Sequence, residues 1–543
     1  MLFLPALLFA LPLLASLLFG LAGAIDLPAW RLRGADSQFW PGLALSLWVG
    51  SASLALSLGA TLVLVTHLHG SVVWRRAQRS LGAVLALPHA AFAIGLGLLL
   101  MPSGLPARAL ALVTGWSAPP DVATVQDRFG LALVAGLVLK EVPFLLWNVV
   151  AQLQRAGHGA QLERQLQTGA SLGYAASSLW WRVLWPQLLP RLALPLLAVW
   201  AYSLTVVDMA LVLGPTRPPT LAVLAWGWLL DADALVNRQG ASAALLLTLT
   251  TALGALLVVV LWNAVRPAWL RRSVRGDRAA AYGRSFARAI VIGAACVYAA
   301  VLALLVFTSF VGVWSFPALW PQLWSGAAWS AAWRSIPTAG LTALLALCSA
   351  ATGLAVAVAW LESAPAHWDA RAAPWVFAPM LVPGVLLVAG LYRLSLWLGI
   401  DGRFAGLWLA HGLFTAPYAL VALAPAYRGF DIRFQQTAHA LGRGHAAFLW
   451  RIKWPMLLAP LASSFAVGFA VSVTQYLSTQ FIGAGRHASV TTEALTLASG
   501  GQRNLAAAFA VLQGALPAAV FAAAWWLGRR QARTLESHRS AAA

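Results

Sequence analysis

The sequence predicts an all-α integral membrane protein with twelve transmembrane helices, arranged as two six-helix repeats that cross the membrane in the same direction. Three observations lead to this fold class. Hydrophobic residues make up 61% of the 543-residue chain and charged residues only 10%, whereas soluble domains are about one quarter charged. Twelve apolar runs are long enough to cross a bilayer. A set of motifs also recurs at a constant offset, by which Gly173 matches Gly442.

Each predicted span contains the roughly 20 mainly apolar residues that the hydrocarbon core requires. The first run could be a cleaved signal peptide, but it lacks a positive start and exceeds the usual apolar length, so we expect a retained helix. The first six spans lie near 2–23, 43–66, 81–101, 130–153, 189–213 and 241–265. The second six lie near 289–312, 336–361, 375–398, 404–425, 459–482 and 504–527.

Basic residues divide the chain and orient it. The segment 266–288 holds seven arginines and separates a first half, 1–265, from a second half, 289–543. With both termini in the cytoplasm, most Lys and Arg fall in cytoplasmic segments, as the positive-inside rule requires. Many of the 28 tryptophans lie near predicted helix ends, where interfacial aromatic residues are expected. This pattern indicates a multi-pass membrane protein.

The clearest repeat lies between the fourth and fifth helices, about 154–188, and between the tenth and eleventh, about 427–457. The first segment contains Trp-Arg-Val-Leu-Trp-Pro at 181–186 and the second Trp-Arg-Ile-Lys-Trp-Pro at 450–455. Upstream of each lies Gln-Thr followed by Leu-Gly, and downstream Gly214 and Arg217 match Gly483 and Arg486. A register held over about fifty residues indicates duplicated halves.

The repeated segment has the features of a small rigid elbow. A short helix should end at Gly173 or Gly442, because a residue without Cβ permits a tight turn. A second amphipathic stretch follows, and Pro186 or Pro455 then opens the next transmembrane helix, where a missing N–H costs little. Such an elbow can transmit force from a docked soluble partner. The alternative is an interfacial helix without a partner, which two copies in register disfavour.

These residues resemble the coupling-loop motif of ABC importer permeases. That motif has Glu-Ala-Ala, three residues, Gly, nine residues, Ile, one residue and Leu-Pro. The Glu-Ala-Ala positions hold Gln in place of Glu in both halves. The resemblance covers nearly the whole chain and is nearest to the fused permeases of thiamine and ferric-iron importers, with the thiamine permeases first. The matching residues are Gln167, Thr168, Gly169, Gly173, Val183 and Pro186 in the first half, and Gln436, Thr437, Ala438, Gly442, Ile452 and Pro455 in the second.

The resemblance implies the ABC importer permease fold in the bacterial inner membrane, with a periplasmic binding protein that delivers the substrate. It also implies that each loop docks in a groove of an ATP-binding subunit, so two loops imply two copies of that subunit. The Gln replacements leave docking to shape and hydrogen bonds rather than to a salt bridge. The implied substrate is a small solute, with thiamine or a related compound ahead of ferric iron.

The sequence offers no motif for catalysis of its own. A P-loop needs Gly-Lys-Ser/Thr to hold phosphates, but the two lysines, Lys140 and Lys453, follow Leu139 and Ile452. Neither His-Glu-x-x-His nor Gly-x-Ser-x-Gly occurs. The two cysteines at 296 and 348 lie in apolar runs, which excludes a cysteine metal site. We therefore expect no cofactor, no metal and no nucleic-acid partner.

Ionisable residues at membrane depth are costly and suggest a function by default. Lys140 and Glu141 lie within the fourth predicted helix and Asp208 within the fifth. The matching part of the eleventh helix carries Gln475 and Tyr476. These five residues are candidates to line a pathway, and Asp208 would suit a cationic substrate. For Lys140 and Glu141, contacts that hold helices together are an equal alternative.

Arg217 and Arg486 lie just outside the membrane at duplicated positions, where they could dock a binding protein or anchor lipid headgroups. The main alternative for the whole chain is a twelve-helix secondary transporter that works without an ATPase. That class places its characteristic Asp and Arg after the second helix, whereas the segment from His67 to Ser80 holds no acid. The position of the repeated loops therefore favours the ABC permease.

Overall fold

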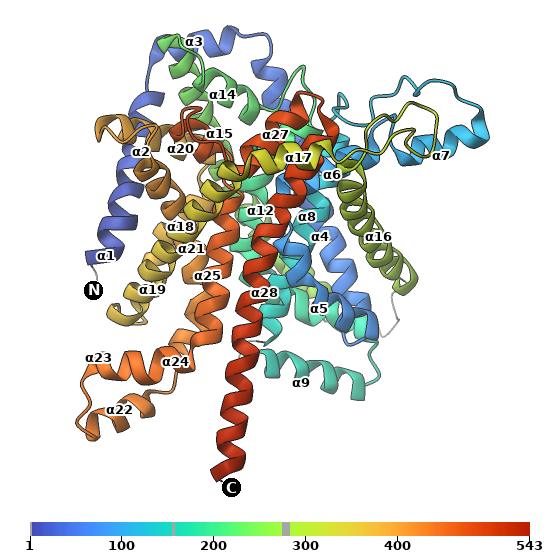
Figure 1. Cartoon of the computed structure of the whole chain (residues 1–543). Coiled ribbons are helices and arrows are strands. Elements are labelled where there is room, and N and C mark those ends of the chain that lie inside the picture. The colour runs from blue at the N-terminus through green and yellow to red at the C-terminus, as the bar shows by residue number, and fades with distance from the viewer. Residues whose placement is uncertain (1–2, 155–157, 274–282, 543) are drawn as a thin grey trace. The chain divides into compact units, whose positions relative to one another are not determined.

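The protein is helical, as predicted, in the computed structural model, which describes residues 3–154, 158–273 and 283–542 (Figure 1). Apart from an isolated bridge between Val311 and Trp324, the regular structure of these residues consists of helices. A helix satisfies its backbone N–H and C=O groups within one segment, which is the condition for crossing hydrocarbon. The predicted fold class is thereby confirmed for the described residues.

Ten helices among the described residues are long and apolar enough to cross a membrane, and two bent pairs raise the number to twelve. The bent pairs are α19 with α20, at 95°, and the helical segment His445–Met456 with α25, at 77°. The ten single spans are Phe3–Ala24, Phe39–Leu68, His89–Thr114, Leu131–Gln154, Ala176–Thr205, Ala234–Arg271, Arg284–Ser309, Ile336–Ser363, Phe404–Arg428 and Arg503–Gln531.

Two predicted spans are interrupted where a proline follows a residue in the extended conformation. The span expected at 81–101 is divided between α5 (Val72–Ala86) and α6 (His89–Leu100), since Leu87 is extended before Pro88. The span expected at 375–398 is the bent pair α19 (Trp368–Leu381) and α20 (Gly384–Trp397), with Val382 extended before Pro383. Proline disfavours helical backbone at the preceding residue, which explains both corrections.

Two further predicted spans are divided at matching points. The span expected at 189–213 consists of α12 (Ala193–Thr205) and α13 (Asp208–Leu213). The span expected at 459–482 consists of α25 (Leu458–Val473) and α26 (Leu477–Ile482). The second members, α13 and α26, occupy positions related by the same offset as Gly173 and Gly442. The duplication therefore extends to the helix breaks.

The chain forms two compact units that do not follow chain order. The N-unit contains Asp26–Ala327 and Ala498–Ala507, and the C-unit contains Met1–Ile25, Ala328–Leu497 and Ala508–Ala543. The predicted halves, 1–265 and 289–543, describe duplication in the sequence rather than packing and stay a prediction. The predicted linker 266–288 falls partly outside the described residues.

In the N-unit, the helix that opens the second repeat packs against helices of the first. The main helices of this unit are α4 (Phe39–Leu68) and α8 (Leu131–Gln154). Tyr298, on α16 (Arg284–Ser309), donates a hydrogen bond to the Leu139 carbonyl at 2.8 Å. Gly95 on α6 admits α16 so closely that a Cβ there would lie 2.7 Å from a methyl carbon of Val301.

In the C-unit, α18 (Ile336–Ser363), α21 (Phe404–Arg428) and α25 pack side by side (Figure 1). The N-terminal helix, α2 (Leu11–Ala24), packs against α20 of the same unit. The first helix of each repeat thus packs with the unit that holds most of the other repeat.

The remaining helices connect or flank these spans, and their bounds are as follows. They are α1 (Phe3–Pro5), η1 (Ala6–Ala10), α3 (Leu27–Ala35), α7 (Leu105–Thr114), α14 (Leu221–Leu229), α15 (Ala234–Ser273), α17 (Ala327–Arg334), α27 (Val490–Ser499) and α28 (Arg503–Ala542).

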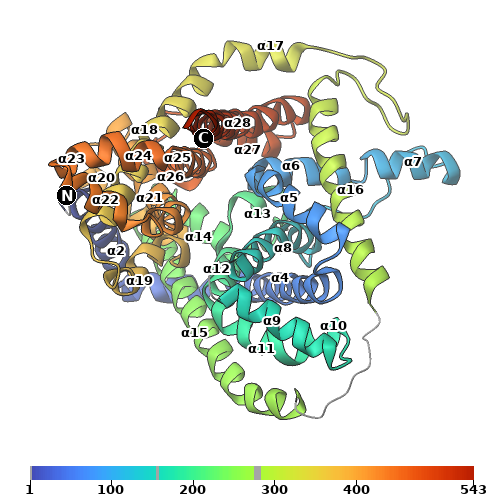
Figure 2. The ribbon, with the colours of Figure 1, turned by 90° about the horizontal axis from the view of Figure 1, so that it is seen from below.

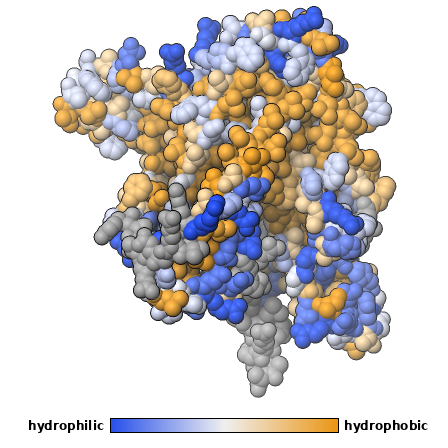
Figure 3. Space-filling model, turned by 180° about the vertical axis from the view of Figure 1, so that it is seen from behind, coloured by the Kyte–Doolittle hydropathy of each residue, from blue (hydrophilic) through white to orange (hydrophobic). Residues whose placement is uncertain are grey.

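Hydrophobic side chains cover much of the face shown in Figure 3, and hydrophilic ones gather toward its two ends. The long helix α15 is an example of an outward apolar surface, with Leu253, Leu256 and Leu257 all more than half exposed. Water would make such exposure unfavourable at about 25 cal/mol per Å², whereas lipid tails are as apolar as leucine. These helices therefore face hydrocarbon.

Small residues bring α2 and α20 into close contact. Ser16 Oγ donates a hydrogen bond to the Leu387 carbonyl at 2.7 Å. A Cβ at Gly390 would lie 1.8 Å from the Ser16 carbonyl oxygen, and one at Gly20 would lie 2.9 Å from the Leu386 carbonyl oxygen. Such contacts are typical of helix pairs in membranes, where close backbone approach replaces the hydrophobic effect.

We predict that Gly390→Leu destabilises the C-unit, because α2 and α20 must separate to admit the new side chain. Overpacking of this kind costs about 1–3 kcal/mol. The measurement is thermal unfolding of the purified chain in detergent, where the midpoint should fall. Gly340→Leu on α18 is the control, since a Cβ there meets nothing within 4 Å. Equal midpoints for the two variants would contradict the described packing.

Candidate functional site

The first repeated segment forms a compact helical elbow in the N-unit. Its first helix, α9 (His158–Ser171), ends in a left-handed turn at Gly173, with φ of 82°. The Tyr174 N–H bonds to the Gly169 carbonyl at 3.1 Å and the Gly173 N–H to the Ala170 carbonyl at 3.0 Å, which is the Schellman arrangement of a helix end. The chain then passes through α10 (Ala176–Leu179), η2 (Trp180–Leu184), α11 (Trp185–Leu188) and η3 (Leu189–Leu192) into α12.

The second repeated segment forms the same elbow in the C-unit. Its first helix, α22 (Ile432–Ala440), ends at Gly442, with φ of 72°. The Arg443 N–H bonds to the Ala438 carbonyl and the Gly442 N–H to the His439 carbonyl, both at 2.9 Å. The turn expected at each glycine is present. The chain continues through α23 (His445–Phe448), η4 (Leu449–Lys453) and α24 (Trp454–Met456) into α25.

Each elbow contains one π turn immediately before its proline. In η2 the Trp185 N–H reaches back to the Trp180 carbonyl, and in η4 the Trp454 N–H reaches the Leu449 carbonyl. The proline that follows has no N–H to continue the helical ladder. Single π turns inside helices occur frequently at functional sites. Their duplication means that both elbows present the same backbone.

Each elbow has a buried small residue on its inner side and polar residues on its outer side. Gly169 lies so close to Leu179 that a Cβ would be 2.4 Å from a methyl carbon of that residue. Ala438, which matches Gly169, is buried with Phe448 and Leu449. A larger side chain would push the helices of the elbow apart. Gln167, Thr168, Gln436 and Thr437 are exposed, Val183 and Ile452 are half-buried, Pro186 is buried and Pro455 is exposed.

The first elbow is held by apolar packing. Trp180 and Trp185 are buried in a cluster that includes residues of α4, α5, α8 and α16. The Trp185 indole N–H donates to Thr66 Oγ1 of α4 at 2.9 Å, so its polar atom is satisfied as a buried tryptophan requires. This elbow is thus joined directly to the membrane helices of the N-unit.

His69 directly follows α4 and packs against two tryptophans of the apolar cluster. Its ring lies 5.8 Å from the Trp74 ring and 5.0 Å from the Trp180 ring, between centroids. Burial lowers the pKa of His69 below its ordinary value of 6.5, and the Glu163 carboxylate offsets this only in part. A neutral imidazole therefore packs between the two indoles.

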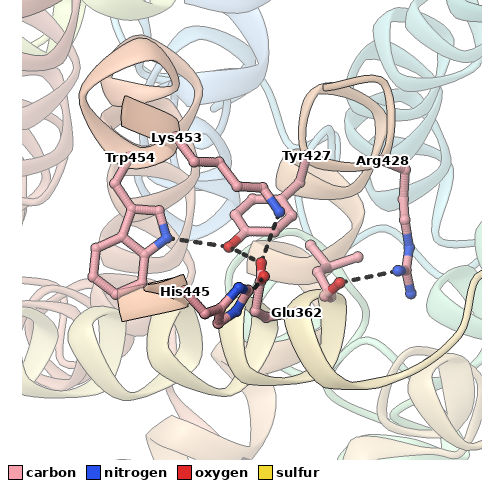
Figure 4. A network of polar contacts seen from close by, with 7 residues as sticks. Glu362, Tyr427, Arg428, His445, Lys453 and Trp454 are labelled. Atoms are coloured by element: carbon pink, nitrogen blue, oxygen red, sulfur yellow. Dashed lines mark hydrogen bonds and ion pairs between the residues drawn. The ribbon is translucent and has the colours of Figure 1, made fainter. Parts of the chain in front are cut away.

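The second elbow is held instead by a polar network centred on Glu362, at the end of α18 (Figure 4). Glu362 accepts hydrogen bonds from Lys453 Nζ at 2.7 Å and from the Tyr427 hydroxyl at 2.8 Å. His445 Nε2 lies 3.1 Å from the same carboxylate. The Trp454 indole N–H donates to the Tyr427 hydroxyl at 3.1 Å. Three elbow residues, Lys453, His445 and Trp454, thus bind side chains of two membrane helices, α18 and α21.

A second ion pair extends this network along α21. Arg428 Nε and Nη2 donate to the two carboxylate oxygens of Asp369 at 2.9 and 2.8 Å, and Nη1 donates to the Leu361 carbonyl at 2.9 Å. The Trp360 indole N–H also donates to Asp369 at 2.9 Å. Bidentate Arg–carboxylate pairs add geometric definition as well as energy. The ends of α18, α19 and α21 are therefore fixed together beside the elbow.

An exposed ion pair starts the second elbow. Asp431 caps α22 by accepting the Arg433 backbone N–H at 2.9 Å, and its carboxylate also accepts the Arg433 guanidinium at 2.8 Å. The Arg433 hydrogen bonds lower the pKa of Asp431 below its ordinary value. Because the pair is exposed to water, its contribution to stability is screened.

The candidate pathway residues of helix α8 lie among buried contacts of the N-unit. Lys140 Nζ donates to the carbonyls of Leu87 at 2.7 Å and Val84 at 3.3 Å, at the end of α5. This ammonium therefore occupies the place of a helix C-terminal cap. Glu141 is the next residue in the sequence and is also buried, with 6% of its surface exposed.

The other candidate pathway residues lie at the helix breaks. Asp208 begins α13, where the Tyr202 side chain hydrogen-bonds its carboxylate. In the C-unit, Gln475 and Tyr476 lie between α25 and α26, and the Ser478 hydroxyl donates to Gln475 Oε1 at 3.1 Å. Broken helices at membrane depth are the usual location of binding sites in transporters.

The two candidate docking arginines are exposed in the turns that follow α13 and α26. Arg217 precedes Pro218 after α13. Arg486 packs over Gly402, where a Cβ would lie 3.2 Å from its Cδ. The structure places each arginine on the surface of a different unit.

The comparison with known proteins decides the family. Over 522 residues the sequence is 35% identical to the inner membrane ABC transporter permease protein YnjC of Escherichia coli (strain K12), and the match covers 95% of this chain and 94% of that protein. The chain belongs to the ABC transporter permeases. The permease is therefore a multi-pass transport subunit of the inner membrane, and its family works in general with an ATPase and a substrate-binding protein.

Two further proteins are similar to a shorter part of the permease. The spermidine/putrescine transport system permease protein PotC of Haemophilus influenzae is 29% identical over 107 residues, which cover 20% of this chain and 42% of that protein. PotC of Escherichia coli (strain K12) is 26% identical over 107 residues, with 20% and 40% covered. No family model matches the chain.

Sequence reasoning missed the network around Glu362. One signal was present, since Lys453 is one of only two lysines in the chain and lies inside the repeated motif. Its counterpart in the first elbow is Leu184, so the repeat itself marked position 453 as different. The partner carboxylate lies 91 residues away and has no local signature.

We predict that Glu362→Gln destabilises the second elbow of the permease. The side chain of Lys453 is only 11% exposed, and removing its counter-charge leaves a largely buried ammonium unpaired. Breaking one partner of a buried pair costs about 3 kcal/mol or more. Thermal unfolding in detergent should show a lower midpoint, and Glu362→Gln with Lys453→Met should recover part of the loss.

Asp431→Asn is the matched control, because it removes the carboxylate of the exposed ion pair in the same elbow. Its midpoint should stay close to that of the unaltered permease. If Glu362→Gln behaved like this control, the buried network would have no anchoring role.

Proposed function

We propose that the permease is the membrane subunit of a binding-protein-dependent importer, driven by ATP hydrolysis on two copies of a separate ATP-binding subunit. The observation that carries the proposal is the pair of duplicated elbows, each with an exposed Gln-Thr face and a rigid turn. One elbow would occupy a groove of one ATP-binding subunit. In this proposal the elbows and both termini would lie in the cytoplasm.

The surface of each elbow supports docking by shape and hydrogen bonds. Gln167 and Thr168, like Gln436 and Thr437, are exposed polar residues without charge. Beside them lie Leu172 and Leu441, which are 59% and 73% exposed. An exposed leucine next to amide and hydroxyl groups suits insertion into a mixed apolar and polar groove.

The elbow turns provide the first test. Proline fixes φ near −65° and cannot occupy a turn at φ of 82° or 72°, so Gly173→Pro or Gly442→Pro should distort one elbow without altering the spans. Strain of 1–3 kcal/mol corresponds to a loss of about tenfold or more. We expect co-purification with the ATP-binding subunit, and ATPase stimulation by the binding protein, to fall by this factor.

Gly115→Pro is the control for this test, because Gly115 ends α7 with φ of 73° far from either elbow in sequence. It should leave association with the ATPase unchanged. If no ATPase associated with the unaltered permease and the chain transported solute alone in proteoliposomes, the secondary-transporter alternative would replace the proposal.

For the substrate we propose a small solute, thiamine or a related compound first and ferric iron second. The resemblance of the repeated motif to thiamine and ferric-iron permeases supports this choice. The partial matches are named for spermidine and putrescine transport, and polyamines and thiamine are all organic cations. A membrane-depth carboxylate at Asp208 agrees with a cationic cargo.

Asp208 therefore provides the second test. In proteoliposomes with the ATPase and binding protein, Asp208→Asn should lower thiamine uptake by about tenfold, as expected for the loss of one charged contact. Uptake of ferric iron and of spermidine is measured in parallel to rank the cargo. Unchanged uptake and unchanged coupled ATP hydrolysis would remove Asp208 from the proposed pathway.

The exposed arginines complete the proposal. Arg217 and Arg486 would contact acidic patches on the binding protein, one on each unit. Lys140 would hold α5 and α8 together beside the proposed pathway, and Glu141 stays a candidate to line it.

A further inference from the structure

A cavity of about 510 Å³ lies in the N-unit between the first elbow and the far end of α15. The elbow contributes the segment from η2 to η3, which packs against α15, and Figure 2 shows α11 and α15 side by side. The proposed docking face is the exposed Gln-Thr surface of α9, whereas the cavity is lined by the later part of the elbow and by α15. The cavity shares Val183 and Pro186 with the coupling-loop motif, and no candidate pathway residue lines it.

Three arginines line the cavity, and none of its lining residues is acidic. Arg182 and Arg191 come from the elbow, and Arg266 comes from α15. Gln187 lies among them, with its amide N–H groups directed to the Val183 carbonyl at 2.7 Å and to Gln165 Oε1 at 3.1 Å. Planar guanidinium groups match the geometry of phosphate oxygens. The charge of the cavity therefore suits a phosphate group.

The order of residues along α15 matches the order of layers at a membrane surface. The unbroken run of exposed apolar residues ends at Leu261, the tryptophans Trp262 and Trp269 follow, and Arg266 lies between them next to the exposed Val265. At 1.5 Å per residue, Arg266 is about 7.5 Å beyond Leu261. Tryptophans at the headgroup level and arginines just beyond them are typical of the interface.

The tryptophans also join the two walls of the cavity. The Trp269 indole N–H donates to the Trp181 carbonyl of the elbow at 3.0 Å. The rest of the lining is apolar and consists of Val183, Pro186, Pro190 and Leu270. A ligand that fits must have an anionic head for the arginines and an apolar part that continues along the outside of α15.

We propose that this cavity binds the headgroup of an anionic phospholipid, with its acyl chains along the exposed leucines and valines of α15. The lipid would bridge the first elbow and α15 and so brace one docking elbow against the membrane. Basic pockets beside transmembrane helices recognise anionic headgroups in this way. The binding itself depends on neither the ATPase nor the transported solute.

The second elbow lacks this site and supplies an internal comparison. Arg451 matches Arg182, but the positions that match Arg191, Arg266 and Gln187 hold Pro460, Leu535 and Met456. There the α28 residue Gln531, which matches Trp262, donates directly to the Pro455 carbonyl. In the C-unit a protein contact thus lies at the counterpart of Pro186, which lines the cavity in the N-unit.

The test measures binding of phosphatidylglycerol to the full permease in detergent by native mass spectrometry, with phosphatidylcholine as the neutral comparison. The unaltered permease should retain phosphatidylglycerol selectively. The double variant Arg191→Gln, Arg266→Gln should bind it about thirtyfold more weakly, since each basic residue near an anionic surface contributes about 1 kcal/mol. Arg451→Gln, at the matching position of the second elbow, should bind like the unaltered permease.

A thermal unfolding midpoint measured without lipid shows that the double variant is folded. Equal retention of phosphatidylglycerol by the double variant and the unaltered permease would overturn the proposal. So would equal retention of phosphatidylcholine, or displacement of the lipid by millimolar inorganic phosphate, which would make the cavity a site for a free anion.

Discussion

Every part of this structure depends on the need to satisfy backbone hydrogen bonds where water is absent. In hydrocarbon an unpaired N–H or C=O costs several kcal/mol, so the chain crosses as helices and departs from them only where another group takes over. Where α5 ends, the Leu87 carbonyl accepts a hydrogen bond from Lys140. Where the first helix of the first elbow ends, the Schellman bonds at Gly173 satisfy the last helical carbonyls. The helix breaks before α13 and α26 follow the same rule, since polar side chains lie at both. Irregular backbone thus marks the places where function can reside.

The two elbows show that one backbone can be held by two kinds of chemistry. The first is fixed by Trp180 and Trp185 within an apolar cluster, in which the Trp185 indole hydrogen-bonds Thr66. The second has Glu362, Lys453 and His445 at the equivalent place. The first anchor buries no charge pair, whereas the second depends on a nearly buried ion pair between Lys453 and Glu362. The duplicated halves therefore differ in the chemistry of their anchors, while the π turns and the turn glycines stay in register.

Much of the fold could be predicted from the sequence because its causes are local. Apolar runs predicted where the spans lie in the sequence, and the offset that relates Gly173 to Gly442 predicted where both elbows lie. The breaks at Pro88 and Pro383 have a local cause too, but a long apolar run on both sides concealed them. The network of Glu362 could not be predicted, since its members are brought together by the packing of α18, α21 and the elbow. The exchange of first helices was hidden for the same reason: nothing in the residues of α2 identifies α20 as its neighbour.

That exchange has a consequence for how the protein is made. Helix α2 is made long before α20, against which it packs, and Ser16 hydrogen-bonds a residue 371 positions later in the chain. Contacts of such high sequence separation form late, so α2 must wait in the membrane without its final neighbour during most of synthesis. The helix α16 closes the first unit only after the second repeat has begun. Neither repeat can therefore finish folding as an isolated product, and a gene split between them would yield two chains that each complete the other.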